Sequence, residues 1–280
     1  SASTPLRGSQ HIAGPTILAS VDQASSLPNL LISDGSAAGT LVRFTGCANI
    51  PNEYPEKMRL GNRLVFACDF AGTGREPWVY DYTTHEASPL ADLNPGPAGS
   101  DFTFLGLANN RLILFSTASA TLWRSDGTPA GTQLLGSVSA YPGIAEVGHG
   151  LLADVGNFAL VIIVRLDGFY SDYGQASIYR LDAAGLTLLH SELRAGVSNV
   201  VAWAGKAYFP FHSSAEGLEL WESDGTVTGT RMVALPLVPG PISAHPHSLT
   251  VAPAHGVLFS AYLGIDDGRE PALWNGTRYL

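Results

Sequence analysis

Four residues between positions 169 and 173 combine aromatic rings with a carboxylate. They are Phe169, Tyr170, Asp172 and Tyr173, and a glycine flanks the stretch on each side, at positions 168 and 174. Aromatic rings can stack on a sugar or a peptide, while a carboxylate accepts hydrogen bonds from its polar groups. We therefore predict a ligand-binding loop at these four residues. The alternative is a loop that folds its rings back onto the protein.

A histidine pair and an acidic pair offer ligands for a metal ion. His245 and His247 lie two residues apart, so on an extended segment both imidazoles face the same side and could bind zinc. Asp266 and Asp267 carry the oxygen ligands that suit calcium. No third ligand lies at a useful spacing from the histidines, and no calcium loop of the Asp-x-Asp-x-Asp-Gly type occurs. We expect no cofactor, with calcium as the alternative.

Motifs of a catalytic nucleophile are absent from the sequence. It contains no Gly-x-Ser-x-Gly, no His-Glu-x-x-His and no phosphate-binding Gly-x-x-x-x-Gly-Lys. Carboxylates are numerous enough for a glycosidase pair, but the sequence does not say which two come together. We therefore predict no catalytic residue, and we interpret the neighbours Arg75 and Glu76 as a local ion pair.

An internal sequence repeat predicts the strands that hold the candidate site residues in place. Residues 122–132 read Leu-Trp-Arg-Ser-Asp-Gly-Thr-Pro-Ala-Gly-Thr, and residues 220–230 repeat the Leu-Trp, the Ser-Asp-Gly-Thr and the final Gly-Thr. An apolar strand precedes each copy, and the residue that aligns with Arg63 in this strand is Val257 in the last copy. The chain therefore reads as one domain of six repeats, each of about 48 residues. The repeats are approximately 4–50, 51–98, 99–140, 141–194, 195–240 and 241–280.

Each repeat divides into about four short strands. In the third repeat these are 101–107, 111–117, 120–125 and 132–138, with Asn109-Asn110 suited to the positive φ angles of a hairpin. We interpret Ser-Asp-Gly-Thr as turn chemistry, and we expect the preceding tryptophans to pack between sheets. The pattern predicts an all-β protein, a β-propeller of six blades with four antiparallel strands each. A β-solenoid is the alternative.

Composition and cysteine content narrow the partners and the compartment. Charged residues make up 14% of the chain, against about 25% in an average protein, and the net charge is −9. An acidic chain excludes nucleic acid as the expected partner, and no apolar run is long enough for membrane insertion. Cys47 and Cys68 could form a disulfide, and two buried thiols are the alternative.

The repeats resemble those of bacterial secreted and surface proteins. Those proteins carry tandem copies of Glu-Leu-Trp-x-Ser-Asp-Gly-Thr-x-x-Gly-Thr, followed by Asp-x-Asn-Pro-Gly-x-x-x-Ser. Residues 219–230 are the fullest match, and residues 92–100 match the connection. The resemblance implies an exported, propeller-like protein whose signal peptide has been removed, and it brings no catalytic residues.

A repeat scaffold without a nucleophile motif predicts a binding protein. We expect a non-catalytic binding or adhesion module that recognises a glycan, a peptide or a protein partner through loops on one face. The alternative is a propeller enzyme that acts on a glycan as a hydrolase or lyase, with acidic residues at the central channel.

Overall fold

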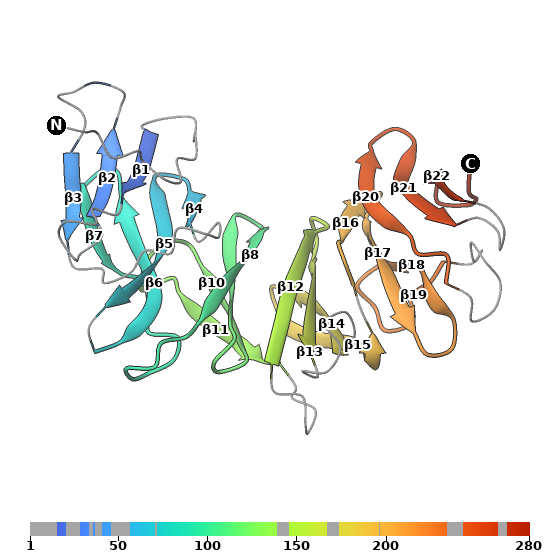
Figure 1. Ribbon diagram of the computed structural model, residues 1–280, viewed down its shortest axis with the longest axis horizontal. Helices are drawn as coiled ribbons and strands as arrows, with labels where there is room; N and C mark the ends of the chain where they lie inside the picture. Colours follow the sequence, from blue (N-terminus) through green and yellow to red (C-terminus); the bar gives the residue numbers. More distant parts are fainter. Residues whose placement is uncertain are drawn as a thin grey trace. The chain divides into compact units, whose positions relative to one another are not determined.

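The computed structural model is an all-β protein (Figure 1). It describes residues 16–20, 29–33, 36, 41–45, 57–70, 72–138, 146–166, 174–195, 197–233, 243–262 and 268–280. These residues form six antiparallel sheets, each built from consecutive strands, which we number first to sixth along the chain. The described part of the chain contains no helix that could cross a membrane.

The first three sheets lie between residues 16 and 137. The first contains β1 (Thr16–Ser20), β2 (Asn29–Ser33) and β3 (Leu41–Thr45). The second contains β4 (Lys57–Leu60), β5 (Arg63–Phe70), β6 (Gly74–Asp81) and β7 (Glu86–Pro89). The third contains β8 (Phe102–Ala108), β9 (Arg111–Ser116), β10 (Thr121–Ser125) and β11 (Gln133–Ser137). In the third sheet the bounds fall within one residue of the four predicted strands.

The last three sheets follow the same order. The fourth contains β12 (Glu146–Asp154), β13 (Ala159–Leu166), β14 (Gly174–Asp182) and β15 (Gly185–Ala195). The fifth contains β16 (Val201–Trp203), β17 (Lys206–Ser213), β18 (Gly217–Ser223) and β19 (Arg231–Met232). The sixth contains β20 (His247–Ala252), β21 (Gly256–Tyr262) and β22 (Arg269–Trp274). The prediction of antiparallel four-stranded sheets is thereby confirmed for the second to fifth sheets, whereas the first and sixth sheets have three strands each among the described residues.

The chain divides into two compact units, which we describe separately. The first comprises residues 1–104 and 110–134, and the second comprises residues 105–109 and 135–280. The organisation of all six repeats as a single domain therefore stays a prediction.

Apolar side chains are buried between consecutive sheets within each unit. In the second unit, Phe209 and Phe211 of β17 share one buried cluster with Leu160 and Ile162 of β13. Trp221 of β18 belongs to the same cluster and is 6% exposed, so the expected packing of this tryptophan between sheets is confirmed. Strands that pack on both faces need apolar residues at every position, which explains the high apolar and low charged content.

The Ser-Asp-Gly-Thr motif forms a compact hydrogen-bonded turn in the third repeat. Asp126 Oδ1 accepts hydrogen bonds from the backbone nitrogen of Thr128 at 3.0 Å and from its hydroxyl at 2.6 Å. Ser125 Oγ accepts from the nitrogen of Gly127, whose φ is +82°, and shares a 2.7 Å hydrogen bond with Thr132 Oγ1. All four motif residues are thus used in the turn, as predicted.

The fifth repeat builds the same turn from its own copy of the motif. Asp224 Oδ1 accepts from the nitrogen of Thr226 at 2.9 Å and from its hydroxyl at 2.7 Å, and Thr226 Oγ1 accepts from the nitrogen of Gly229 at 3.0 Å. A Cβ atom on Gly229 would collide with the Asp224 carboxylate. The final Gly-Thr of the motif therefore needs glycine because a carboxylate lies against its Cα.

The glycine of the Ser-Asp-Gly-Thr motif also packs against a side chain of the preceding repeat, in both the third and the fifth repeats. A Cβ on Gly127 would lie 3.1 Å from the side chain of Arg63 in the second sheet, and a Cβ on Gly225 would lie 3.1 Å from the ring of Phe158, which immediately precedes β13. Arg63 is opposite Asp81 across the β5–β6 pair, and Phe158 holds the corresponding place in the fourth repeat. One contact between consecutive repeats thus recurs in both units.

The sixth sheet exposes a position that is buried in earlier sheets. Leu258, opposite Leu273, is 44% exposed, whereas Val65, opposite Val79, is completely buried. In the second sheet Arg63 is opposite Asp81, and the residue that aligns with Asp81 in the sixth repeat is Asn275. Val257 is opposite Trp274, so the residue opposite Asn275 is Gly256. Gly256, rather than the predicted Val257, is therefore the counterpart of Arg63. The sixth hairpin is one residue longer than the spacing in the sequence indicated.

Candidate functional site

In each repeat the strands equivalent to β5 and β6 are joined at one end of the sheet, which we call the hairpin end. The Ser-Asp-Gly-Thr turns lie at the opposite end. The predicted ligand-binding residues Phe169, Tyr170, Asp172 and Tyr173 fall between β13 and β14 but lie outside the described residues. Asp266 and Asp267 fall between β21 and β22 and also lie outside them. These assignments stay predictions.

A serine, a carboxylate and an imidazole meet at the hairpin end of the fourth and fifth sheets. Glu192 Oε1 accepts hydrogen bonds from the backbone nitrogen of Ser214 at 2.6 Å and from its hydroxyl at 2.8 Å. His190 Nε2 lies 3.5 Å from Glu192 Oε2. Sequence reasoning missed this group because Glu192 and Ser214 are 22 residues apart on different sheets.

The chemistry of this group follows from the protonation state of its carboxylate. Burial opposes ionisation, but the hydrogen bonds from Ser214 and the neighbouring His190 together lower the pKa of Glu192. Glu192 is therefore ionised at neutral pH and is a weak base. Ser214 donates to this carboxylate, whereas a serine hydrolase activates its serine through histidine. The arrangement joins two sheets and does not reproduce a Ser-His-Asp triad.

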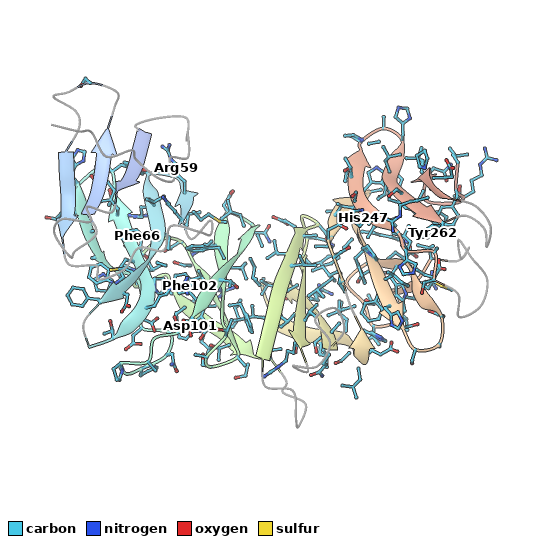
Figure 2. All side chains as sticks on the ribbon, in the orientation of Figure 1. Arg59, Phe66, Asp101, Phe102, His247 and Tyr262 are labelled. Carbon is cyan, nitrogen blue, oxygen red and sulfur yellow. The ribbon has the colours of Figure 1, made fainter. Side chains whose placement is uncertain are left out.

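A second cluster of cationic and aromatic groups lies at the hairpin end of the fifth and sixth sheets. Its centre is Tyr262, which is labelled in Figure 2. The Arg269 guanidinium lies over the Tyr262 ring at 5.3 Å from its centroid, and the His245 ring meets the same tyrosine edge-on at 5.9 Å. Burial, followed by the charges of Arg269 and His212, lowers the pKa of His245. At neutral pH His245 is therefore a neutral imidazole, able to accept a hydrogen bond or a proton.

The predicted histidine pair does not have the geometry on which its metal site was based. His245 has a φ of +49°, so the segment is not extended at this residue, and its backbone nitrogen donates to Leu218 O at 3.2 Å. His247 is exposed, and its Nδ1 is hydrogen-bonded to Ser248 Oγ. In the part of the chain that the structure describes, no three His, Cys, Asp or Glu side chains come together as metal ligands.

Cys68 lies in the core and belongs to a disulfide. Its side chain is completely buried next to Phe66 and Trp78 in one apolar cluster of the second sheet. Cys47, the chain's other cysteine, lies outside the described residues. The structure therefore shows that Cys68 is in a disulfide, while the predicted partner, Cys47, is not described.

Glu76 is a buried carboxylate that anchors the connection between the second and third sheets. It is 2% exposed, and its Oε2 accepts a hydrogen bond from the Leu93 nitrogen at 2.8 Å. Burial raises the pKa of Glu76. Arg75 instead lies 3.7 Å from the Asp101 carboxylate and over the Phe102 ring (Figure 2). The interpretation of Arg75 and Glu76 as an ion pair is therefore wrong, since neighbouring strand residues point to opposite faces.

Comparisons with known proteins show the fold of the chain. No family model and no curated protein matches it. Among solved structures, one from a study of two prolyl endopeptidases has a TM-score of 0.53 and 15% identity. It covers 99% of this chain, and this chain spans 42% of that protein. This likeness shows that the fold is propeller-like.

Two further structures have lower scores, which carry no argument by themselves. The propeller domain of the trilobed protease from Pyrococcus furiosus has a TM-score of 0.44 and 11% identity, with 95% of this chain and 76% of that chain covered. A puromycin-hydrolysing peptidase from Mycobacterium tuberculosis has a TM-score of 0.49 and 7% identity, with coverages of 96% and 45%.

The solved structure with a TM-score of 0.53 corrects the functional prediction made from the sequence. A non-catalytic binding or adhesion module was expected, yet that structure comes from a study of two prolyl endopeptidases. The expectation rested on the absence of a nucleophile motif from the sequence, and this chain spans less than half the length of that protein.

Proposed function

We propose that this chain is the propeller of a hydrolytic enzyme that acts on peptides. The observation that carries the proposal is the likeness to a prolyl endopeptidase, which extends over 99% of this chain and 42% of that protein. Peptide is the substrate class to test first because it is the one that this neighbour cleaves.

The propeller is proposed to control access to the catalytic centre rather than to supply its nucleophile. The sequence has no Gly-x-Ser-x-Gly motif, and Ser214 donates to Glu192 instead of to a histidine. A structure that admits only some substrates contributes to specificity without touching the reacting atoms. We expect the bond to be cleaved by residues other than Ser214.

The six sheets are proposed to be the six blades of one propeller. The recurring contact of Gly127 with Arg63, and of Gly225 with Phe158, supports a regular step from each repeat to the next.

Export from the cell is part of the proposal. The disulfide at Cys68 supports it, because structural disulfides persist mainly in oxidising compartments. The resemblance of the repeats to those of secreted bacterial proteins points the same way.

A peptidase assay on the full-length natural protein tests the proposal. The purified protein is incubated with a library of internally quenched peptides, and products are identified by mass spectrometry. We expect cleavage of a subset of the peptides, and cleavage that is unchanged in Ser214→Ala. A parallel library of oligosaccharides covers the glycan alternative. Turnover of oligosaccharides alone, or of neither library, would refute the peptidase proposal, and loss of cleavage in Ser214→Ala would refute the assigned role of the propeller.

A further inference from the structure

The fourth sheet contains a buried arginine without a partner. Arg165 of β13 is 6% exposed, and its Nε and Nη1 atoms are enclosed without a hydrogen-bond acceptor. Arg180 on the adjacent strand also has a buried Nε without a partner, but its Nη2 lies 2.6 Å from Asp182 and its guanidinium covers the Phe158 ring. Within the described ranges, by contrast, no carboxylate pairs with Arg165.

An unpaired charge inside a protein is costly. Removing a guanidinium from water costs several kcal/mol unless an anion or hydrogen-bond acceptors replace the water. A buried arginine with two unsatisfied nitrogens therefore indicates that an anion belongs beside it.

Polar side chains accompany Arg165 on the same face of the sheet. Gln175 is opposite Arg165 across the β13–β14 pair, so the two side chains share a face. Gln175 is 2% exposed, and its Nε2 donates to Ser191 Oγ at 3.0 Å. Ser191 Oγ also shares a 3.0 Å hydrogen bond with Ser177 Oγ. The Oε1 atom of Gln175 has no partner, so this face holds both a guanidinium without an acceptor and an amide oxygen without a donor.

We propose that Arg165 and Gln175 bind the carboxyl terminus of a peptide. A carboxylate accepts the N–H groups of a guanidinium with good geometry. The amide N–H of the same terminal residue is the donor that Gln175 Oε1 lacks. One terminal residue thus satisfies both vacant partners. This site goes beyond the proposed hydrolase function, because it does not depend on where or whether a bond is cleaved.

The position of these residues connects them with the predicted ligand-binding loop. Arg165 stands one residue before the end of β13, and Gln175 is the second residue of β14. The segment between the two strands contains Phe169, Tyr170 and Tyr173. The carboxylate site is therefore built on the two strands that this loop joins.

Binding of a blocked dipeptide tests the proposal independently of hydrolysis. The full chain is titrated with acetyl-Ala-Ala and, separately, with acetyl-Ala-Ala-amide, and affinity is measured by calorimetry and by the shift in melting temperature. We expect the acid to bind at least tenfold more tightly than the amide and than inorganic phosphate. Arg165→Met should remove the response to the acid, and the melting temperature of the unliganded protein should stay equal or rise because an unpaired charge is gone.

Two variants complete the test. Arg180→Met changes an arginine that already has a partner, and it should leave the preference for the acid unchanged. Arg165→Lys keeps the charge, so that the fold is preserved, but loses the planar donors and should weaken acid binding at least tenfold. Equal affinity for acid and amide, or an affinity for phosphate that matches the acid, would overturn the proposal. A lower melting temperature in Arg165→Met without any response to the acid would also overturn it, since Arg165 would then be neutralised from within the chain.

Discussion

In the Ser-Asp-Gly-Thr turn of the fifth repeat, the Asp224 carboxylate lies against Gly229, and this contact allows a quantitative prediction about the free energy of unfolding. Gly229→Ala places a methyl group where the Asp224 carboxylate lies, so the carboxylate has to leave its two hydrogen bonds with Thr226. Each bond contributes about 0.5–1.5 kcal/mol to stability, and exposure of Asp224 keeps the sum near the lower end. We expect Gly229→Ala and Asp224→Ala each to cost about 1.5 kcal/mol.

The double variant distinguishes this mechanism from two independent effects. Once Asp224 is alanine, the methyl group of Gly229→Ala has nothing to displace, so the double variant should cost about 1.5 kcal/mol and not about 3 kcal/mol. The coupling free energy is then about 1.5 kcal/mol. The effect of glycine on the unfolded chain occurs in both arms of the cycle and cancels.

Thermal unfolding followed by circular dichroism measures this cycle. A cost of 1.5 kcal/mol lowers the melting temperature by about 3–6 °C in a protein of this size. The hydrogen bonds from Thr226 lower the pKa of Asp224, so its stabilising effect is present at neutral pH and is lost as the pH falls through the folded-state pKa. Additive costs in the two single variants would refute the reasoning, because they would mean that the methyl group acts elsewhere.

Three further predictions concern buried groups. Burial raises the pKa of Glu76, so its carboxyl group keeps its proton to a higher pH in the folded protein than in the unfolded chain. The free energy of unfolding should therefore fall as the pH rises from about 4.5 through the folded-state pKa of Glu76. Glu76→Gln should remove this part of the pH dependence, measured by urea unfolding at several pH values, and an unchanged profile would contradict it. Reduction with dithiothreitol should lower stability by about 3 kcal/mol because the disulfide at Cys68 is lost, and a Cys68→Ala variant without this response is the control. Phe209→Ala should cost about 3–5 kcal/mol by opening a cavity between the fourth and fifth sheets, whereas Leu188→Ala, on the exposed side of β15, should cost less than about 1 kcal/mol.

The strands of the third repeat show how far local patterns reach. Their bounds follow from apolar runs closed by turn residues, and Asn109 and Asn110 have φ angles of +50° and +57°, as their position in a tight turn predicts. The function of Asp126 as a turn residue was equally predictable, because it bonds atoms only two residues away. Local chemistry is sufficient for such elements.

The candidate sites could be predicted much less well. The aromatic and acidic residues at 169–173 lie outside the described residues, so their role stays a prediction. Glu192 and Ser214 are brought together by two different sheets, and Arg165 becomes notable only through burial without a partner. A sequence cannot show either property, because burial and pairing depend on residues far away along the chain.

Sequence and tertiary structure therefore decide different things in this protein. The sequence alone determined the all-β class, the repeat of about 48 residues and the turn chemistry, because each of these depends on residues close together in the chain. Only the tertiary structure decided that Glu76 binds the Leu93 nitrogen rather than Arg75, that His245 is not extended, and that the last hairpin has one more residue. It also revealed the unpaired charge of Arg165, because desolvation is a property of the packed sheets and not of any segment by itself.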